Sequence, residues 1–165
     1  MRHPFALSLL VLVSAVAPTA AQTKFSMSGK CGKADVQQAV PAADAPNHMM
    51  TVAQGKCLPV KAAEIGGSPA TEGAFAEHGE VTGDKGQVWG MYVDTLANKE
   101  KVYYRYEGTA VMKDGALQTM QNKWQIVGGS DKLKGIKGQG TCTGKGNPDG
   151  GLTFDCQGEY TLAGK

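Results

Sequence analysis

A strict alternation of apolar and polar residues in "LTFDCQGEYTL", residues 152–162, constrains the fold of this chain more than any other feature. In an extended strand, successive side chains point to opposite faces, so every second residue shares a face. One face of this segment carries only apolar and small residues, namely Leu152, Phe154, Cys156, Gly158, Tyr160 and Leu162. The other face carries only polar side chains. The segment is therefore predicted to be a strand of an antiparallel sheet that buries one face and exposes the other to water.

The same two-residue period recurs along the chain, and helical periodicity is almost absent. Segment 34–48 is the one stretch that could hold a short helix, which Pro41 and Pro46 would end. Turn residues separate about eight extended segments, a pattern typical of an all-β sandwich or a closed barrel with little helix. We expect strands in the segments 23–31, 48–60, 73–81, 86–96, 101–112, 116–127, 133–144 and 152–162.

The stretch "VGGSDKLKGIKGQGTC", residues 127–142, threads glycines among lysines and raises the possibility of a phosphate-binding loop. Such a loop requires a Gly-Lys pair followed by Ser or Thr, and no Gly-Lys pair in the chain is followed by either residue. In a strand, Gly138 and Gly140 fall on the face opposite to the lysines, where glycine leaves space for a bulky neighbour. We therefore expect these glycines to make room inside a bent sheet, filled in part by Trp124 and Ile126.

All four cysteines lie beyond residue 21, and an even number of cysteines in an oxidising compartment favours disulfides. The segment "GTCTGKGNPDGGLTFDC" is typical of a hairpin, because its centre contains Pro, Asp and Gly. If the two strands pair evenly around this turn, Cys142 faces Cys156 at a Cα separation of about 4.5–5.5 Å. Cys31 and Cys57 then form the second disulfide by elimination. No pair has the C-x-x-C spacing of a zinc site, so we expect no zinc.

The first 21 residues have the three parts of a secretory signal peptide. Arg2 provides the positive start, residues 5–16 the apolar core, and Thr19 and Ala21 the small residues before the cleavage site. The apolar run is too short to span a bilayer, which needs about 20 residues. We expect residues 22–165 to form a single exported domain, periplasmic or secreted, with no membrane span.

The formal net charge of the chain is +2. The predicted signal peptide carries Arg2 and no acidic residue, so the mature chain would carry +2 − 1 = +1. A nearly neutral protein with interspersed charges is not typical of nucleic-acid binding. The sequence therefore indicates no nucleic-acid partner, indicates no cofactor, and leaves the oligomeric state open.

The segment "IVGGSDKLKGIKGQG", residues 126–140, resembles a late-strand signature of dirigent and allene oxide cyclase proteins. That pattern runs apolar-Val-Gly-Gly-Thr-Gly-x-Phe-x-x-Ala-x-Gly, and the chain departs from it at Ser130, Asp131, Leu133 and Ile136. The resemblance implies an eight-stranded antiparallel barrel with a central cavity, of the allene-oxide-cyclase or calycin type. It carries over no catalytic residue. The substrates of that family, plant phenolic radicals and oxylipins, are not transferred to this chain.

His78 and Glu80 lie two residues apart in a predicted strand and so share a face. An imidazole beside a carboxylate can perform general acid–base catalysis near neutral pH. The segment around them, residues 76–86, is polar, which favours a solvated strand face over a catalytic site.

The block "VYYRYEG" places chemically useful side chains on both faces of one strand. If Tyr103, Arg105 and Glu107 point into a barrel, they could bind a carboxylate or polarise a carbonyl group. If Tyr104 and Tyr106 point inward instead, the cavity wall is aromatic and the other face carries a surface ion pair of little energetic consequence. Because the second face continues into apolar residues, we expect the two tyrosines to face inward.

His48, Met49 and Met50, together with Met27 and Met120, offer the ligand types that suit Cu(I). In a strand, however, Met49 and Met50 point to opposite faces, and buried methionine more often fills space. We therefore expect no metal site.

Three functions are compatible with such a barrel, and the sequence does not decide whether the protein is an enzyme. The favoured one is binding of a small apolar or amphipathic molecule without catalysis, because a barrel of about eight strands has room for one small ligand. Tyr104, Tyr106 and Trp124 are the candidate ligand contacts. The second is a cyclase or isomerase that acts on a ligand in the cavity. The third is a structural or surface-interaction role with a filled barrel.

Overall fold

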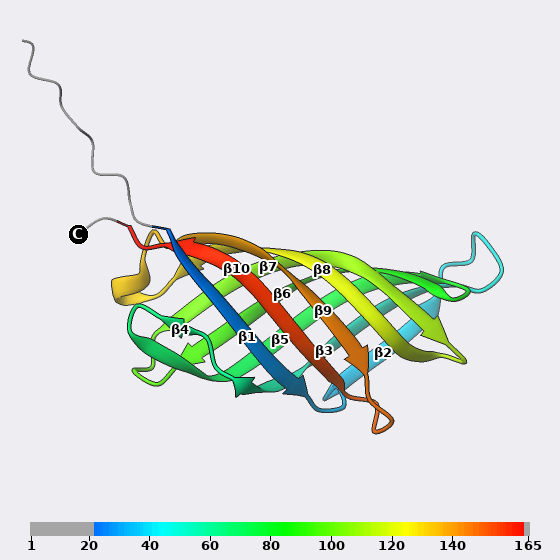
Figure 1. Ribbon diagram of the computed structural model, residues 1–165. Helices are drawn as coiled ribbons and strands as arrows, with labels where there is room; N and C mark the ends of the chain where they lie inside the picture. The colour runs from blue at the N-terminus through cyan, green and yellow to red at the C-terminus, as the bar shows by residue number, and fades with distance from the viewer. Residues whose placement is uncertain (1–21, 164–165) are drawn as a thin grey trace, which may run out of the picture.

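The computed structural model describes residues 22–163, which fold into an antiparallel β-barrel (Figure 1). The predicted signal peptide, residues 1–21, lies outside these described residues. Within them, helical structure is limited to a single 3₁₀ turn, η1 (Asp131–Leu133). No helix between residues 22 and 163 is long and apolar enough to cross a membrane.

Ten strands make up the sheet, and all of their pairings are antiparallel. Their bounds are β1 (Thr23–Cys31), β2 (Val36–Pro41), β3 (His48–Lys61), β4 (Glu64–Ile65), β5 (Ser68–Thr82), β6 (Lys85–Leu96), β7 (Lys101–Lys113), β8 (Ala116–Gly129), β9 (Lys137–Gly146) and β10 (Leu152–Thr161). The hydrogen-bonded order is β2-β3-β1-β10-β9-β8-β7-β6-β5-β4, and an additional pairing of β3 with β5 closes the sheet on itself. Eight strands therefore form the closed barrel, which confirms the predicted fold class, and β2 and β4 are additional.

Segment 34–48, considered above as a possible helix, forms β2 and a turn instead. Residues 36–41 pair with residues 49–54 of β3, along the same edge of β3 that β1 uses further along. This pairing gives partners to backbone groups of β3 that a helix would have left unpaired. Pro41 is the last residue of β2, where its missing N–H removes no interior hydrogen bond of the sheet.

The glycines of β9 point into the barrel and make room for bulky side chains of β8, as predicted. A Cβ atom on Gly138 would lie 2.7 Å from Cδ1 of Ile126, and one on Gly140 would collide with the indole ring of Trp124. Gly158 of β10 lies against the same indole ring. Because Gly140 and Gly158 lack a side chain, Trp124 can lie flat against the wall and remain only 5% exposed.

One end of the barrel is closed by apolar side chains. η1 and the short β4 hairpin lie at this end, beside the start of β1 (Figure 1). The side chains that fill it are at most 3% exposed and include Ile65, Leu96, Val102, Leu133 and Ile136. Burial of each such side chain contributes roughly 1.5–3 kcal/mol. This end is therefore a conventional apolar core, and open space inside the barrel is confined to the remainder.

The two disulfides join the cysteines as predicted, Cys31 with Cys57 and Cys142 with Cys156. Cys142 and Cys156 face each other on β9 and β10, as the hairpin argument required. Cys31 and Cys57 face each other on β1 and β3. Both disulfides are compatible with an oxidising environment.

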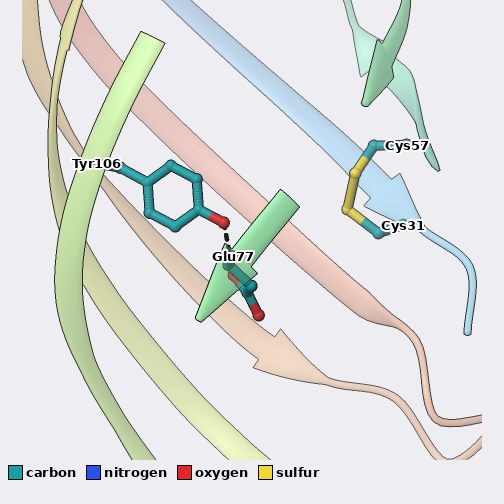
Figure 2. Close-up of a disulfide and its surroundings, with 4 residues drawn as sticks. All are labelled: Cys31, Cys57, Glu77 and Tyr106. Atoms are coloured by element: carbon teal, nitrogen blue, oxygen red, sulfur yellow. Dashed lines mark hydrogen bonds between the residues drawn. A yellow bond between two sulfur atoms is a disulfide. The ribbon is translucent and has the colours of Figure 1, made fainter. Parts of the chain in front are cut away.

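The disulfide between Cys31 and Cys57 bridges the shortest seam of the barrel (Figure 2). β1 and β3 pair over only four residue pairs, from Ser28 with Lys61 to Cys31 with Cys57. Every other seam of the eight-stranded barrel pairs over eight to twelve. The covalent link therefore stabilises the barrel at the seam where backbone hydrogen bonding is least extensive.

We expect the double variant Cys31→Ser/Cys57→Ser to lower the free energy of unfolding by about 3–4 kcal/mol, because it removes a cross-link that spans 26 residues. Urea denaturation followed by circular dichroism measures this loss. Native-state hydrogen exchange should also show reduced protection of the amides between β1 and β3. The matched variant Cys142→Ser/Cys156→Ser should lose about 3 kcal/mol but keep that protection. Equal loss of protection at the seam in both variants would contradict this assignment.

Candidate functional site

A cavity of about 290 Å³ occupies the part of the barrel that the apolar core does not fill. Its wall is formed by residues of the eight barrel strands and is mostly apolar. The aromatic residues that line it are Phe25, Phe75, Tyr92, Tyr104, Tyr106, Trp124 and Phe154. This cavity is the candidate functional site.

Alternation along the strands explains why these rings converge. Tyr92 pairs with Tyr104 across β6 and β7, and Tyr106 pairs with Trp124 across β7 and β8. Directly opposed residues of an antiparallel pair share a face, so all four side chains point inward. The ring of Trp124 lies edge-on to Tyr104 at a centroid distance of 5.6 Å and is tilted against Phe25 at 5.3 Å. Such contacts fix the orientation of the rings and make a rigid wall.

Glycines opposite the large rings create the space that the cavity needs. A Cβ atom on Gly73 would collide with the phenol of Tyr92, and one on Gly90 would lie 2.5 Å from Cζ of Tyr106. The rings therefore extend across neighbouring strands and do not project straight to the barrel axis. This arrangement leaves open volume in the centre.

The most prominent polar group in the cavity is the carboxyl group of Glu77 on β5. Tyr106 Oη donates a hydrogen bond of 2.5 Å to Glu77 Oε2, and Figure 2 shows the two side chains pointing toward one another. Burial raises the pKa of Glu77, and the hydrogen bond from Tyr106 partly opposes this increase. Burial, followed by the nearby charge of Glu77, raises the pKa of Tyr106. The tyrosine therefore stays protonated and acts as a donor.

A second carboxyl–tyrosine pair lies at the boundary between the cavity and the closed end. Tyr104 Oη donates a hydrogen bond of 2.9 Å to Asp94 Oδ2, and Asp94 is 1% exposed. Burial raises the pKa of Asp94 to about 6, and the hydrogen bond from Tyr104 lowers it. Asp94 does not line the cavity, so its role is to hold the ring of Tyr104 in the wall.

Two further polar atoms in the wall lack hydrogen-bond partners among the described residues. These are Oδ1 of Asn122, an acceptor, and Nε1 of Trp124, a donor. Both residues lie on β8 and line the cavity. Buried polar groups usually have a hydrogen-bond partner, and these two atoms are exceptions to that rule.

The cavity wall contains no basic side chain from residues 22–163. Every lysine and arginine in that range is exposed on the outside of the barrel. Among residues 22–163, Glu77 provides the one carboxyl group in the wall, and Asp94 is buried outside the cavity lining. The interior therefore carries acidic groups without compensating positive charge.

The cavity reaches the surface at the end opposite to the apolar core. Exposed residues Gly32 and Gly150 line it, together with Ala34 and Gly151. They belong to the β1–β2 loop and the β9–β10 turn, and an ion pair of 3.1 Å joins Lys30, near the end of β1, to Asp149 in that turn. Beyond Cys31 the chain leaves β10 and pairs only with β3, so the barrel wall is not hydrogen-bonded there.

The predicted ligand contacts Tyr104, Tyr106 and Trp124 all line the cavity. Tyr103, Arg105 and Glu107 lie on the outer face of β7, so the alternative in which these three line the cavity is not what the structure shows. Inward-facing tyrosines were expected, because their face continues into apolar residues.

His78 and Glu80 share the outer face of β5, outside the cavity. The ring of His78 is exposed and stacks on Trp89 at a centroid distance of 5.7 Å. The carboxylate of Glu80 lies 3.9 Å from Nε2 of His48. The structure therefore gives each of the two residues a partner on the surface and no connection to the candidate site.

No cluster of three or more His, Cys, Asp or Glu side chains suited to a metal ion occurs within residues 22–163. Nδ1 of His48 lies 2.6 Å from Oδ1 of Asp44 in the turn after β2. Met27 and Met120 line the cavity, whereas Met50 is exposed on the outer face of β3, so the methionines do not converge.

Sequence reasoning did not single out Glu77, Asp94 or Asn122, although alternation contained the signal. Glu77 shares its parity with Phe75, and Asn122 shares its parity with Trp124. Residues two positions apart in a strand share a face, so Glu77 and Asn122 face the lumen together with these aromatic residues. His78 lies on the opposite face of the same strand as Glu77.

No protein-family model matches the chain, and no curated protein matches it.

We expect the buried carboxyl group of Asp94 to make the protein less stable as the pH rises. Its folded pKa of about 6 exceeds the unfolded value of about 3.9, so the stabilisation present at low pH is lost as the pH rises through 6. Relative to the variant Asp94→Asn, the wild type should lose roughly 2–3 kcal/mol between pH 4 and pH 7.5. Urea denaturation of both proteins at both pH values measures this difference, because other groups titrate alike in the two. If the free energy of unfolding changed equally with pH in the two proteins, Asp94 would not be the group that causes the loss of stability.

Proposed function

We propose that this is an exported protein, periplasmic or secreted, that holds one small apolar or amphipathic molecule in its barrel without catalysing its conversion. The observation that carries the proposal is the aromatic-walled cavity of about 290 Å³ that opens at one end of the barrel. The two disulfides support an extracytoplasmic location, because disulfides persist in oxidising compartments.

The size and chemistry of the cavity support a small ligand. Ligand pockets usually enclose about 300–1000 Å³ and combine apolar walls with a few polar groups that orient the ligand. The volume here lies at the lower end of that range. Apolar surface that a ligand buries contributes about 25 cal/mol per Å², so even a small aromatic molecule could bind with useful affinity.

The barrel is rigid where the ligand would bind. Glycines accommodate the large rings, and the hydrogen bond between Asp94 and Tyr104 fixes one wall. A preformed cavity reduces the ordering that binding requires. This supports a protein that holds a molecule, and the open cavity argues against the filled barrel that a purely structural role predicts. The resemblance to allene oxide cyclases and dirigent proteins supports the same type of cavity-containing barrel.

The cyclase or isomerase alternative has one observation in its favour. Glu77 and Tyr106 form a carboxyl–phenol pair inside the cavity, and burial raises the pKa of Glu77. Such a pair could transfer a proton to or from a bound ligand. The residues first considered for catalysis, His78 and Arg105 among them, lie on the outer face and give this alternative no support.

We expect 2-naphthol, a neutral amphipathic probe, to bind with one molecule per chain in isothermal titration calorimetry. The variant Ala53→Phe places a large side chain in the cavity wall and should weaken binding at least tenfold, because it fills the space that the probe needs. The matched variant Val52→Phe places the same side chain on the outer face of the same strand and should bind like the wild type. No binding by the wild type, or equal weakening by both variants, would contradict binding in the lumen.

A further inference from the structure

We propose that the ligand is a protonated organic amine with an apolar body, whose ammonium group binds Glu77 inside the aromatic wall. This inference rests on the proposed function and names the class of molecule that the same cavity would hold. It follows from three properties of the cavity, which are its charge, its free hydrogen-bond acceptors and its aromatic faces.

The first property is the charge of the interior. Glu77 lies in the wall, and no lysine, arginine or histidine between residues 22 and 163 lines the cavity. A buried carboxylate without a positive partner lowers the stability of the fold. Buried carboxylates in proteins are therefore normally paired with a positive group. A cationic ligand supplies that partner. A carboxylate ligand, such as a fatty acid, would add a second negative charge and be repelled.

The second property is the pattern of unused acceptors. Oε2 of Glu77 accepts the hydrogen bond from Tyr106, whereas Oε1 accepts none from residues 22–163. Oδ1 of Asn122, in the same wall, is also an acceptor without a partner in that range. A primary ammonium group has three N–H donors and no acceptor. Oε1 of Glu77 therefore offers an unused acceptor to the ammonium group of a primary amine.

The third property is the arrangement of aromatic rings around the carboxyl group. Phe75 lies two residues before Glu77 on the same face of β5 and pairs with Tyr92 on β6. Tyr106 reaches Glu77 from β7, across Gly90. The faces of aromatic rings attract cations within about 6 Å, and aromatic cages are a common way to bind organic ammonium groups. Carboxyl group and rings therefore favour the same kind of head group.

The test compares three molecules that share a phenethyl body and differ in the head group. These are 2-phenylethylamine, which is cationic at pH 7, 2-phenylethanol, which is neutral, and 3-phenylpropanoate, which is anionic. We expect calorimetry with the wild-type protein to show the amine binding at least tenfold more tightly than the alcohol, and no measurable binding of the carboxylate.

The variant Glu77→Gln removes the charge and keeps an oxygen that can accept the hydrogen bond from Tyr106. It should weaken binding of the amine at least tenfold and leave binding of the alcohol within about twofold. The matched variant Glu80→Gln removes a carboxylate three residues further along, on the outer face of the same strand, and should bind the amine like the wild type.

The outcomes separate this inference from the proposed function. If the alcohol binds as tightly as the amine, or the carboxylate binds most tightly, the amine proposal is wrong while lumenal binding stands. If none of the three molecules binds and 2-naphthol does not bind either, the proposed function itself fails. The series on the wild type decides the question even where Glu77→Gln is poorly folded.

Discussion

Closure of the sheet is the constraint on which the rest of this structure depends. β3 pairs with β5 along one edge and with β1 and then β2 along the other, so it is the strand that completes the ring. The β1–β3 seam is short in backbone pairing, and the disulfide between Cys31 and Cys57 reinforces it. Because closure removes unpaired edges around most of the ring, every barrel strand must bury one face in a shared interior.

The size of the side chains that face this shared interior differs between the two ends of the barrel. Aliphatic residues such as Leu96 and Val102 fill one end completely, whereas the other end combines large aromatic rings with glycines. A ring opposite a glycine, such as Trp124 over Gly140, lies along the wall and leaves the axis open. The cavity is thus a direct consequence of pairing the largest residues with the smallest.

Within residues 22–163, buried carboxyl groups occur without buried basic side chains, which distinguishes this interior from a simple apolar core. Retaining Glu77 in the wall costs stability, since burial disfavours its charged form and only Tyr106 among the described residues donates to it. Stability alone would favour an apolar residue at this position, because a well-packed apolar side chain has no such cost. This cost is the reason for proposing that the carboxyl group at this position orients a ligand.

Local pattern in the sequence determined the eight strands of the closed barrel, their inward faces, the role of the glycines near residue 140 and both disulfides. These features depend on alternation and turn residues, which act over a few neighbouring positions. Only the tertiary structure decided that residues 36–41 form a strand, that a cavity exists, and that Glu77 and Tyr106 meet within it. The latter two residues lie 29 positions apart and meet across an intervening strand, so their contact follows from barrel closure and register. No local pattern in the sequence specifies a contact between residues so far apart in the chain.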